Sequence, residues 1–597
     1  MRKHLGRRAA AAVLAAGLLG AGAGAAAAEV SVRVYFDGEL AAPTDVNGEP
    51  VEVFARDGTT YLPLRAIAGY LGIPIEWDPE TGAVYVGTIP GRTVKTKTGT
   101  YVGRLDPETG VVAYKGVTFG TAERWKRAEL PAESDEVHYP AESVLPVQGT
   151  YDPETQSEDV LQMDIYVNPA GTSDKKAVIV WCPVGGGTAS RGGSTDPSKI
   201  VAEEPDVIVA VPNSRVSYFG CINLTEFDDY AEYEDEYRYS NNLIRTDFLL
   251  ALQWIGENVA AFGGDPENVT IGGQSAGAVT ASSMLLIPGA TEYFDKVIME
   301  SGVAIDRISL ATWEESLEAA EKFREHTGVT TIAEALELEP QELLDAQAYL
   351  SSGAIGAYLP DSQSKMFTTV IDNVVVFDDY WEQLEEVAAS NDVEILVGST
   401  NGEYDRDLAG LSEEEALEAI ISANWGKLDP ARGGAEDADE IIGSYVERNE
   451  QYGRDTITAY KDLKNDINQK VSAVMIAELF SRGGNAYLFS YEWYAENADG
   501  LRAVHGSDRN ALFGTDENAP EELQKAMRRA WSCFALTGDP NAGNAYFEDA
   551  GVEWEPYDAE GKCTMVFDTD LHTEAGQRVE DIETLMPLFG EYEALRG

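Results

Sequence analysis

Hydrophobic and polar positions follow two different periods along most of this chain. Residues 177–181 and 206–212 are short, continuous runs of mainly β-branched apolar residues, which are typical of strands buried on both faces. Residues 248–264 repeat apolar positions at helical spacing and end on two glycines. Further strand-like runs cover residues 268–273, 296–302 and 393–400. Strands that alternate with helices predict an α/β fold with a mostly parallel, doubly wound sheet.

Two long segments interrupt this alternation. Residues 303–370 and 408–482 have a mainly helical pattern and are rich in acidic side chains. We expect them to be helical insertions that cover one end of the sheet.

The first part of the chain has a pattern of its own. Residues 31–36 alternate as a strand, residues 46–54 place an Asn47-Gly48 turn between extended segments, and residues 75–87 have the pattern of a hairpin. Residues 60–72 predict a strand that leads into a short helix. We therefore predict three parts: an export segment over residues 1–28, a small α+β module over 29–90 and the large α/β domain over 91–597.

Residues 1–28 have the features of a secretory signal peptide. Arg2, Lys3, Arg7 and Arg8 form a basic start, a weakly apolar run follows, and three alanines precede Glu29. The alternative is a membrane anchor, but the run is rich in Ala and Gly and lacks bulky apolar residues. We expect cleavage and a secreted or cell-surface location. No later stretch reaches the ~20 apolar residues that span a bilayer, so we expect no membrane insertion.

The chain is strongly acidic, with 103 acidic and 44 basic residues and a formal net charge of −59. Such a charge repels nucleic acid and anionic membranes, keeps the protein soluble and mildly favours neutral or cationic ligands. It identifies no reaction.

The cysteines and histidines give no sign of a metal site. The four cysteines allow three disulfide pairings, and the sequence does not choose among them. No CxxC pair or histidine-rich cluster is present, so we expect no metal and no cofactor. The cysteines are Cys182, Cys221, Cys533 and Cys563.

The strongest chemical signal is the pentapeptide Gly273-Gln274-Ser275-Ala276-Gly277, which fits G-x-S-x-G. In that motif the serine occupies a sharp turn between a strand and a helix, where its hydroxyl is exposed at the carboxyl edge of the sheet. The pattern places the pentapeptide between a predicted strand and the helical run 281–287. The plainer alternative is a tight strand-to-helix corner where small residues only permit packing. We predict that Ser275 is a nucleophile.

A longer series of motifs surrounds this elbow. Residues 114–117 and 157–161 precede the first core strands, residues 262–270 lead into the elbow, and residues 534–541 and 554–557 lie near the end. In this order, over about residues 98–597, they resemble the type B carboxylesterases, the family of cholinesterases and bacterial para-nitrobenzyl esterases. The resemblance implies an α/β-hydrolase fold and the hydrolysis of small-molecule esters without a cofactor.

The resemblance also implies partners for the serine. In α/β-hydrolases an acid and then a histidine follow the nucleophile along the chain. Glu403 follows a predicted strand, in a loop similar to the family's G-x-N-x-D-E-G. Because Thr400, Gly402 and Tyr404 depart from that loop, Asp405 remains an alternative acid.

His505 is the expected base. It begins a His-Gly-x-Asp stretch that matches the family's pattern, and His572 is the only other histidine after Glu403. A histidine can accept the serine proton and later protonate the leaving group, while a carboxylate holds its tautomer.

The oxyanion of the tetrahedral intermediate needs hydrogen-bond donors. The backbone N–H of Ala276, directly after the nucleophile, is one, and the resemblance implies Gly186 and Gly187 as the others. This glycine loop departs from the family: Val184 replaces a histidine, Thr188 replaces a phenylalanine, and one extra residue precedes the glycines. These departures leave the specificity of the acyl pocket open.

Other matched positions have a structural meaning in the family. The resemblance implies two buried ion pairs, Arg124 with Glu158 and Arg215 with Asp265. Ser301 matches a serine that supports the triad, although an ordinary turn at a strand end explains it equally well.

The module over 29–90 resembles the N-terminal domain of copper amine oxidases. The matching residues are Gly58 to Arg65, Leu71-Gly72 and Trp77-Asp78. No histidine lies between residues 5 and 137, so we expect no copper, and we expect the module to associate the protein with the cell surface.

The sequence thus predicts a secreted serine carboxylic-ester hydrolase with a Ser275-Glu403-His505 triad. One alternative is a non-catalytic surface adhesion protein on the same fold. Another is a hydrolase of amide, carbamate or thioester bonds.

Overall fold

The computed structural model describes residues 91–139, 143–183, 185, 188–190, 195–305, 310–351, 367–428, 435–484, 486–495 and 501–589, with separate short stretches between residues 30 and 87. The predicted export segment and the predicted Asn47-Gly48 turn lie outside the described residues. The chain divides into two compact units. One contains residues 1–93 with 101–103 and 137–140, and the other contains the rest.

The first unit contains short antiparallel pairs of strands. Strand β6 (Ile75–Asp78) pairs with β7 (Ala83–Val86), which confirms the hairpin predicted over 75–87. Strand β4 (Phe54–Arg56) likewise pairs with β5 (Thr59–Tyr61). The domain limits 29–90 and 91–597 stay predictions.

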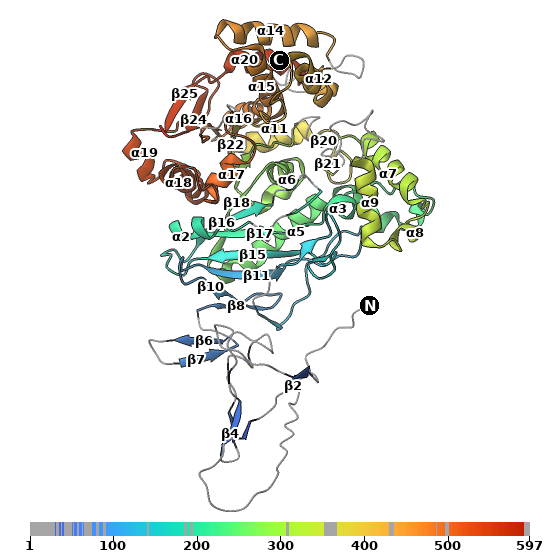
Figure 1. Cartoon of the computed structure of the whole chain (residues 1–597), viewed down its shortest axis with the longest axis vertical. Coiled ribbons are helices and arrows are strands. Elements are labelled where there is room, and N and C mark those ends of the chain that lie inside the picture. Colours follow the sequence, from blue (N-terminus) through green and yellow to red (C-terminus); the bar gives the residue numbers. More distant parts are fainter. Residues whose placement is uncertain are drawn as a thin grey trace, which may run out of the picture. The chain divides into compact units, whose positions relative to one another are not determined.

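The second unit is built on one large sheet with eleven strands among its described residues. In the sheet order, each strand from β17 to β24 is parallel to the next one in that run. The strands at the two edges pair antiparallel. This confirms the predicted mostly parallel sheet (Figure 1). The order is β10 (Arg104–Leu105), β11 (Val112–Thr118), β15 (Gln162–Val167), β17 (Val207–Pro212), β16 (Lys176–Cys182), β18 (Gly264–Gln274), β19 (Lys296–Glu300), β22 (Glu394–Thr400), β23 (Ala486–Tyr491), β24 (Cys563–Phe567) and β25 (His572–Ala575).

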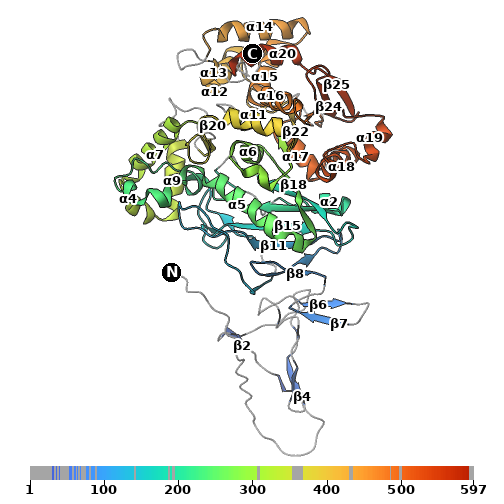
Figure 2. The same cartoon turned by 180° about the vertical axis from the view of Figure 1, so that it is seen from behind.

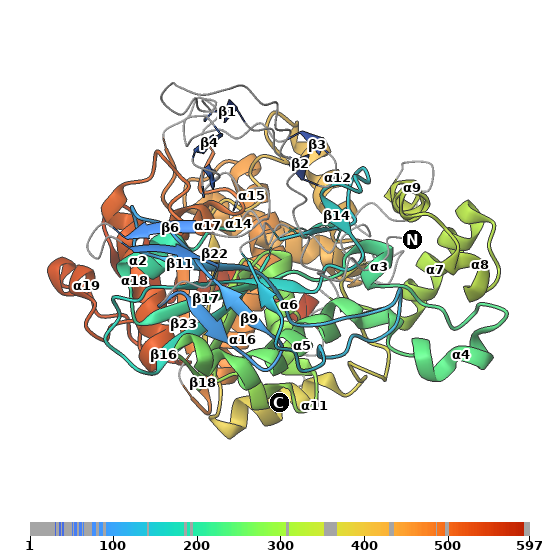
Figure 3. The same ribbon diagram turned by 90° about the horizontal axis from the view of Figure 1, so that it is seen from below.

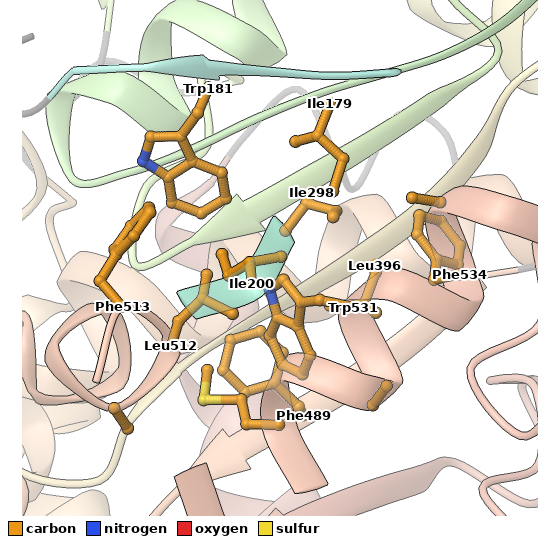
Figure 4. Close-up of a cluster of buried hydrophobic side chains, with 14 of the residues drawn as sticks. Ile179, Trp181, Ile200, Ile298, Leu396, Phe489, Leu512, Phe513, Trp531 and Phe534 are labelled. Carbon is orange, nitrogen blue, oxygen red and sulfur yellow. The ribbon is translucent and has the colours of Figure 1, made fainter. Parts of the chain in front are cut away.

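Helices cover both faces of this sheet. Every residue of β16 and β17 is buried, as their continuous apolar runs predict. On one face, α2 (Ser198–Glu203), α17 (Ser507–Leu512) and α18 (Glu521–Thr537) share an apolar cluster with the strands (Figure 4). Trp181 meets Phe513 edge-on there at 5.3 Å between ring centroids. Helices α5 (Leu243–Asn258) and α16 (Val471–Ser481) pack against β18 and β22 outside this cluster.

The boundary between α5 and β18 differs from the prediction. The helix ends at Asn258, a 3₁₀ turn covers Val259–Phe262, and the strand begins at Gly264. The prediction of a helix to residue 264 was therefore wrong, because the apolar spacing continues through the 3₁₀ turn. Gly263 ends that turn with φ of +86°, a conformation that suits glycine.

The two predicted insertions are mainly helical, as expected. Helices α7–α9 and the end of the sheet that carries α18 and α19 (Ala545–Ala550) lie far apart in all three views (Figures 1, 2 and 3). The first insertion holds α7 (Trp313–Thr327), α8 (Ile332–Leu336) and α9 (Pro340–Ser351), and the second holds α12 (Glu413–Ala423), α13 (Trp425–Leu428), α14 (Ala438–Gln451), α15 (Thr456–Asn465), the π-helix η7 (Asp466–Lys470) and α16.

The predicted ion pairs are half right. Arg124 donates to Glu158 at 2.9 Å, so the expected pair forms, but it is partly rather than fully buried. Arg215 pairs with Asp247 on α5, and not with Asp265. Asp265 pairs with Lys175 instead. The reason is that Arg215 follows the carboxyl end of β17, whereas Asp265 lies at the amino end of the parallel strand β18.

The described residues contain neither a disulfide nor a helix that could span a membrane. All four cysteines lie in described segments, where none of them forms a disulfide, and three of them are buried. Within the same segments no helix has both the length and the apolar character to cross a bilayer.

Candidate active site

Ser275 occupies a strained turn between β18 and helix α6 (Ala276–Ser283). Its φ and ψ are 57° and −129°, a region that a residue with a side chain rarely enters. The backbone N–H of Ser275 donates to the carbonyl of Glu300 on the neighbouring strand at 2.9 Å, which holds the turn in place. The predicted elbow is therefore present.

The small residues around Ser275 are required by close backbone contacts. A Cβ atom on Gly273 would lie 2.4 Å from the carbonyl carbon of Gly277, and a Cβ on Gly277 would lie 2.4 Å from the carbonyl oxygen of Cys182. A Cβ on Gly302 would lie 2.5 Å from the carbonyl oxygen of Ser275. Glycine is thus needed where strand, helix and the next strand end converge.

His505 lies at hydrogen-bond distance from Ser275. Its Nε2 is 2.8 Å from the serine Oγ, and its Nδ1 is 2.5 Å from Oε2 of Glu403. The histidine side chain is 34% exposed, while that of Glu403 is fully buried. The structure therefore brings the three predicted residues together in the order that a base-activated serine requires.

Glu403 is held by further donors. The hydroxyl of Ser301 donates to its Oε1 at 2.6 Å, and the backbone N–H of Thr400 donates to the same oxygen at 2.7 Å. Burial is the largest influence on the pKa of Glu403 and would raise it. The charge and hydrogen bond of His505, with the bonds from Ser301 and Thr400, outweigh burial and lower the pKa.

The surroundings of His505 raise its pKa. Burial is the largest influence on the pKa of His505 and would lower it, but Glu403, Asp508 and Asp407 raise it above the usual histidine value. Asp508 is itself buried, and its Oδ2 is 3.1 Å from the hydroxyl oxygen of Ser301. Burial and the nearby charge of Glu403 raise the pKa of Asp508 to about 7.

The alternative candidates lie elsewhere. Asp405 is buried and accepts from Arg502 at 2.7 Å, so it has a partner of its own. His572 lies on β25 and is 3.4 Å from Glu574. Neither contacts Ser275.

The predicted oxyanion donors are only partly described. Ala276 is the first residue of α6, and the first N–H groups of a helix have no partner within the helix. Its N–H is therefore suited to bind an oxyanion beside Ser275. Gly186 and Gly187 lie outside the described residues.

Sequence reasoning missed three neighbours of the histidine. The Tyr404 ring is stacked against the imidazole at 6.2 Å between centroids and an interplanar angle of 12°. The amide of Gln274 is 3.4 Å from Nε2 of His505. Asp508 could have been found, because it lies three residues after His505 and so near it on the first turn of α17.

Comparison with known proteins gives the family. The profile of the Carboxylesterase family matches residues 90–584. The chain belongs to this family. Similar proteins include the para-nitrobenzyl esterase of Bacillus subtilis (strain 168), which is 26% identical over 73% of this chain and 84% of its own, and carboxylesterase 5A of Canis lupus familiaris, which is 28% identical over 72% and 73%.

Solved structures and a second profile agree with the two predicted resemblances. A crystal structure of a Geobacillus stearothermophilus carboxylesterase superposes with a TM-score of 0.69 and 25% identity, and the match covers 83% of this chain and all of that one. The α/β-hydrolase fold is thereby confirmed, and the protein is a carboxylic ester hydrolase. The Copper amine oxidase N-terminal domain profile matches residues 45–113, which confirms the second resemblance.

Proposed function

We propose that Ser275, His505 and Glu403 form the catalytic triad of this esterase. The observation that carries the proposal is the continuous chain of hydrogen bonds from the serine hydroxyl through both imidazole nitrogens to the buried carboxylate. An imidazole oriented in this way can remove the proton of the serine as the hydroxyl attacks a carbonyl carbon.

The reaction then proceeds through an acyl-enzyme. As Ser275 Oγ bonds to the ester carbon, the proton moves to Nε2 of His505 and the carbonyl oxygen becomes an oxyanion. The N–H of Ala276 binds this oxyanion, with Gly186 and Gly187 as the further proposed donors. His505 returns the proton to the leaving alcohol oxygen, and the alcohol departs. Water then releases the acid by the same steps, and Ser275 is regenerated.

We expect Ser275→Ala to abolish ester hydrolysis without unfolding the protein, because only one hydroxyl is removed. Loss of a triad residue lowers the rate by about 10⁴- to 10⁶-fold. The measurement is hydrolysis of para-nitrophenyl butyrate, with circular dichroism as the folding control and a fluorophosphonate probe to label the nucleophile.

An active Ser275→Ala enzyme, or labelling of another residue, would reject the triad. A folded wild-type protein with neither labelling nor hydrolysis would favour the adhesion alternative. Amide, carbamate and thioester analogues in the same assay test the other bond types. Export remains part of this proposal, supported by the basic and apolar pattern of residues 1–28.

A further inference from the structure

Arg245 on α5 is a buried cation that forms no ion pair with any carboxylate in the described segments. Only 3% of the residue is exposed. Its Nε donates to the hydroxyl of Thr369 at 2.6 Å and its Nη1 to the hydroxyl of Thr280 at 2.9 Å. In the described parts of the chain, Nη2 has no hydrogen-bond partner and no carboxylate lies within ion-pair distance of the guanidinium. Arg215 is equally buried, but it is paired with Asp247.

Burying a charge without a partner costs solvation free energy. Buried charged groups are therefore normally paired. Burial lowers the pKa of Arg245 to about 10, so the guanidinium is still protonated at neutral pH. Two neutral hydroxyls do not neutralise it. The negative charge of an anionic ligand would neutralise it.

The guanidinium borders the open face of the nucleophile helix. The hydroxyl of Thr280 that it contacts donates in turn to the carbonyl of Ala276 at 3.0 Å. Thr280 is four positions after Ala276 on the helix, which corresponds to a rise of about 6 Å along its axis. The partly exposed residues of α6 are Ala276, Val279 and Thr280, and the buried ones are Gly277, Ala278, Ala281, Ser282 and Ser283.

Cys182 at the end of β16 also lies near Arg245, and its carbonyl oxygen packs closely against Gly277 of α6. The guanidinium interacts electrostatically with Cys182, the last residue of β16, and the loop that carries the glycines follows directly. Arg245 therefore contacts α6, which begins at the proposed donor Ala276, and lies near the carboxyl end of β16.

The position of His505 shows which part of an ester would reach Arg245. The imidazole lies on the side of Gln274, before the nucleophile, at 3.4 Å. Since His505 protonates the leaving alcohol, the alcohol portion lies on that side. An acyl portion that leaves Ser275 on the other side, past Ala276, would approach Thr280 and Arg245.

We infer that Arg245 binds a carboxylate at the far end of the acyl group, so that half-esters of short dicarboxylic acids are preferred substrates. This rests on the proposed function, because it takes Ser275 as the nucleophile. The net charge of −59 predicts neutral or cationic ligands at long range. Arg245 reverses that preference locally, within the acyl site.

The test compares two esters that differ only in charge. Para-nitrophenyl hemiglutarate carries a terminal carboxylate, and para-nitrophenyl glutaramate carries a neutral amide of the same shape. Hydrogen bonds to a charged group contribute enough to predict a kcat/KM ratio of about 10- to 100-fold in favour of the hemiglutarate. In Arg245→Leu the ratio is expected to fall to near one, whereas Arg245→Lys retains the charge and most of the preference.

Lys175→Leu is the matched control, because it removes an exposed cation at the amino end of the sheet and should leave the ratio unchanged. A wild-type ratio near one overturns the inference even if Arg245→Leu does not fold, and so does an undiminished ratio in a folded Arg245→Leu. If Ser275→Ala is inactive while the wild-type ratio is near one, only this inference fails. If Ser275→Ala hydrolyses both esters, the proposed triad fails.

Discussion

At the scale of single residues, the sequence pattern singles out Ser275 more clearly than it separates the two candidate acids. Gly273 and Gly277 predicted the elbow because backbone contacts at 2.4 Å leave no room for a side chain. Glu403 and Asp405 are both acids in one loop, so motif spacing alone did not separate them. Long-range partners do: Glu403 meets His505, and Asp405 meets Arg502.

The buried Asp508 gives a prediction about pH. Its charge raises the pKa of His505, and its own pKa is raised to about 7. Asp508→Asn keeps the shape but removes the charge, so the imidazole loses its proton at lower pH. We expect the ascending limb of kcat/KM against pH to move to lower pH. Asp135→Asn, an exposed position, is the control and should leave the limb in place. A limb that moves upward would contradict the assigned role.

At the scale of elements, the second insertion does more than cover the sheet. The acid and histidine loops are joined by backbone hydrogen bonds, Gly402 to Ala503 at 2.9 Å and His505 to Glu403 at 3.2 Å. Arg502 in the histidine loop pairs with Asp405 and also donates to Asp462 on α15. Helix α15 thereby anchors the loops that carry Glu403 and His505. The apolar periodicity predicted the helices of this insertion, but not this contact, because the partners lie far apart in the sequence.

Mutations can separate the structural role of Asp405 from the catalytic role proposed for Glu403. Asp405→Asn leaves the partly buried Arg502 without its main partner and should cost about 1–3 kcal/mol of stability. Glu403→Gln should instead lower kcat strongly, by about 10²- to 10⁴-fold, since it loses the charge that stabilises the imidazolium. Urea unfolding followed by fluorescence and kcat per folded enzyme measure the two effects. If Asp405→Asn lowers kcat at unchanged stability, Asp405 takes part in catalysis.

At the scale of the whole molecule, the alternation of strands and helices was enough to predict the sheet, because buried parallel strands need continuous apolar runs. The ion-pair partners of residues on different strands were harder to predict. Asp265 was expected to meet Arg215, but the two lie at opposite edges of the parallel strands. Sequence spacing does not report the edge at which a loop residue lies. The acidic composition likewise predicts a negative electrostatic field around the molecule. It does not predict local positive sites such as Arg245.

The negative charge of the whole chain also affects how activity depends on pH. The proposed triad needs a neutral imidazole, so kcat/KM should rise with pH through the ionisation of His505, above its usual value of about 6.5 because the pKa is raised. The net charge of −59 adds a long-range contribution that salt screens over about 10 Å at 0.1 M. We expect the limb to move to lower pH as sodium chloride is added. Buried pairs are screened much less, so the difference between wild type and Asp508→Asn should persist at high salt. A profile flat from about pH 5 to 9 with chemistry limiting the rate would exclude a histidine base. A limb that salt does not move would leave only the contacts of Glu403, Asp508 and Asp407 as the cause of the raised pKa.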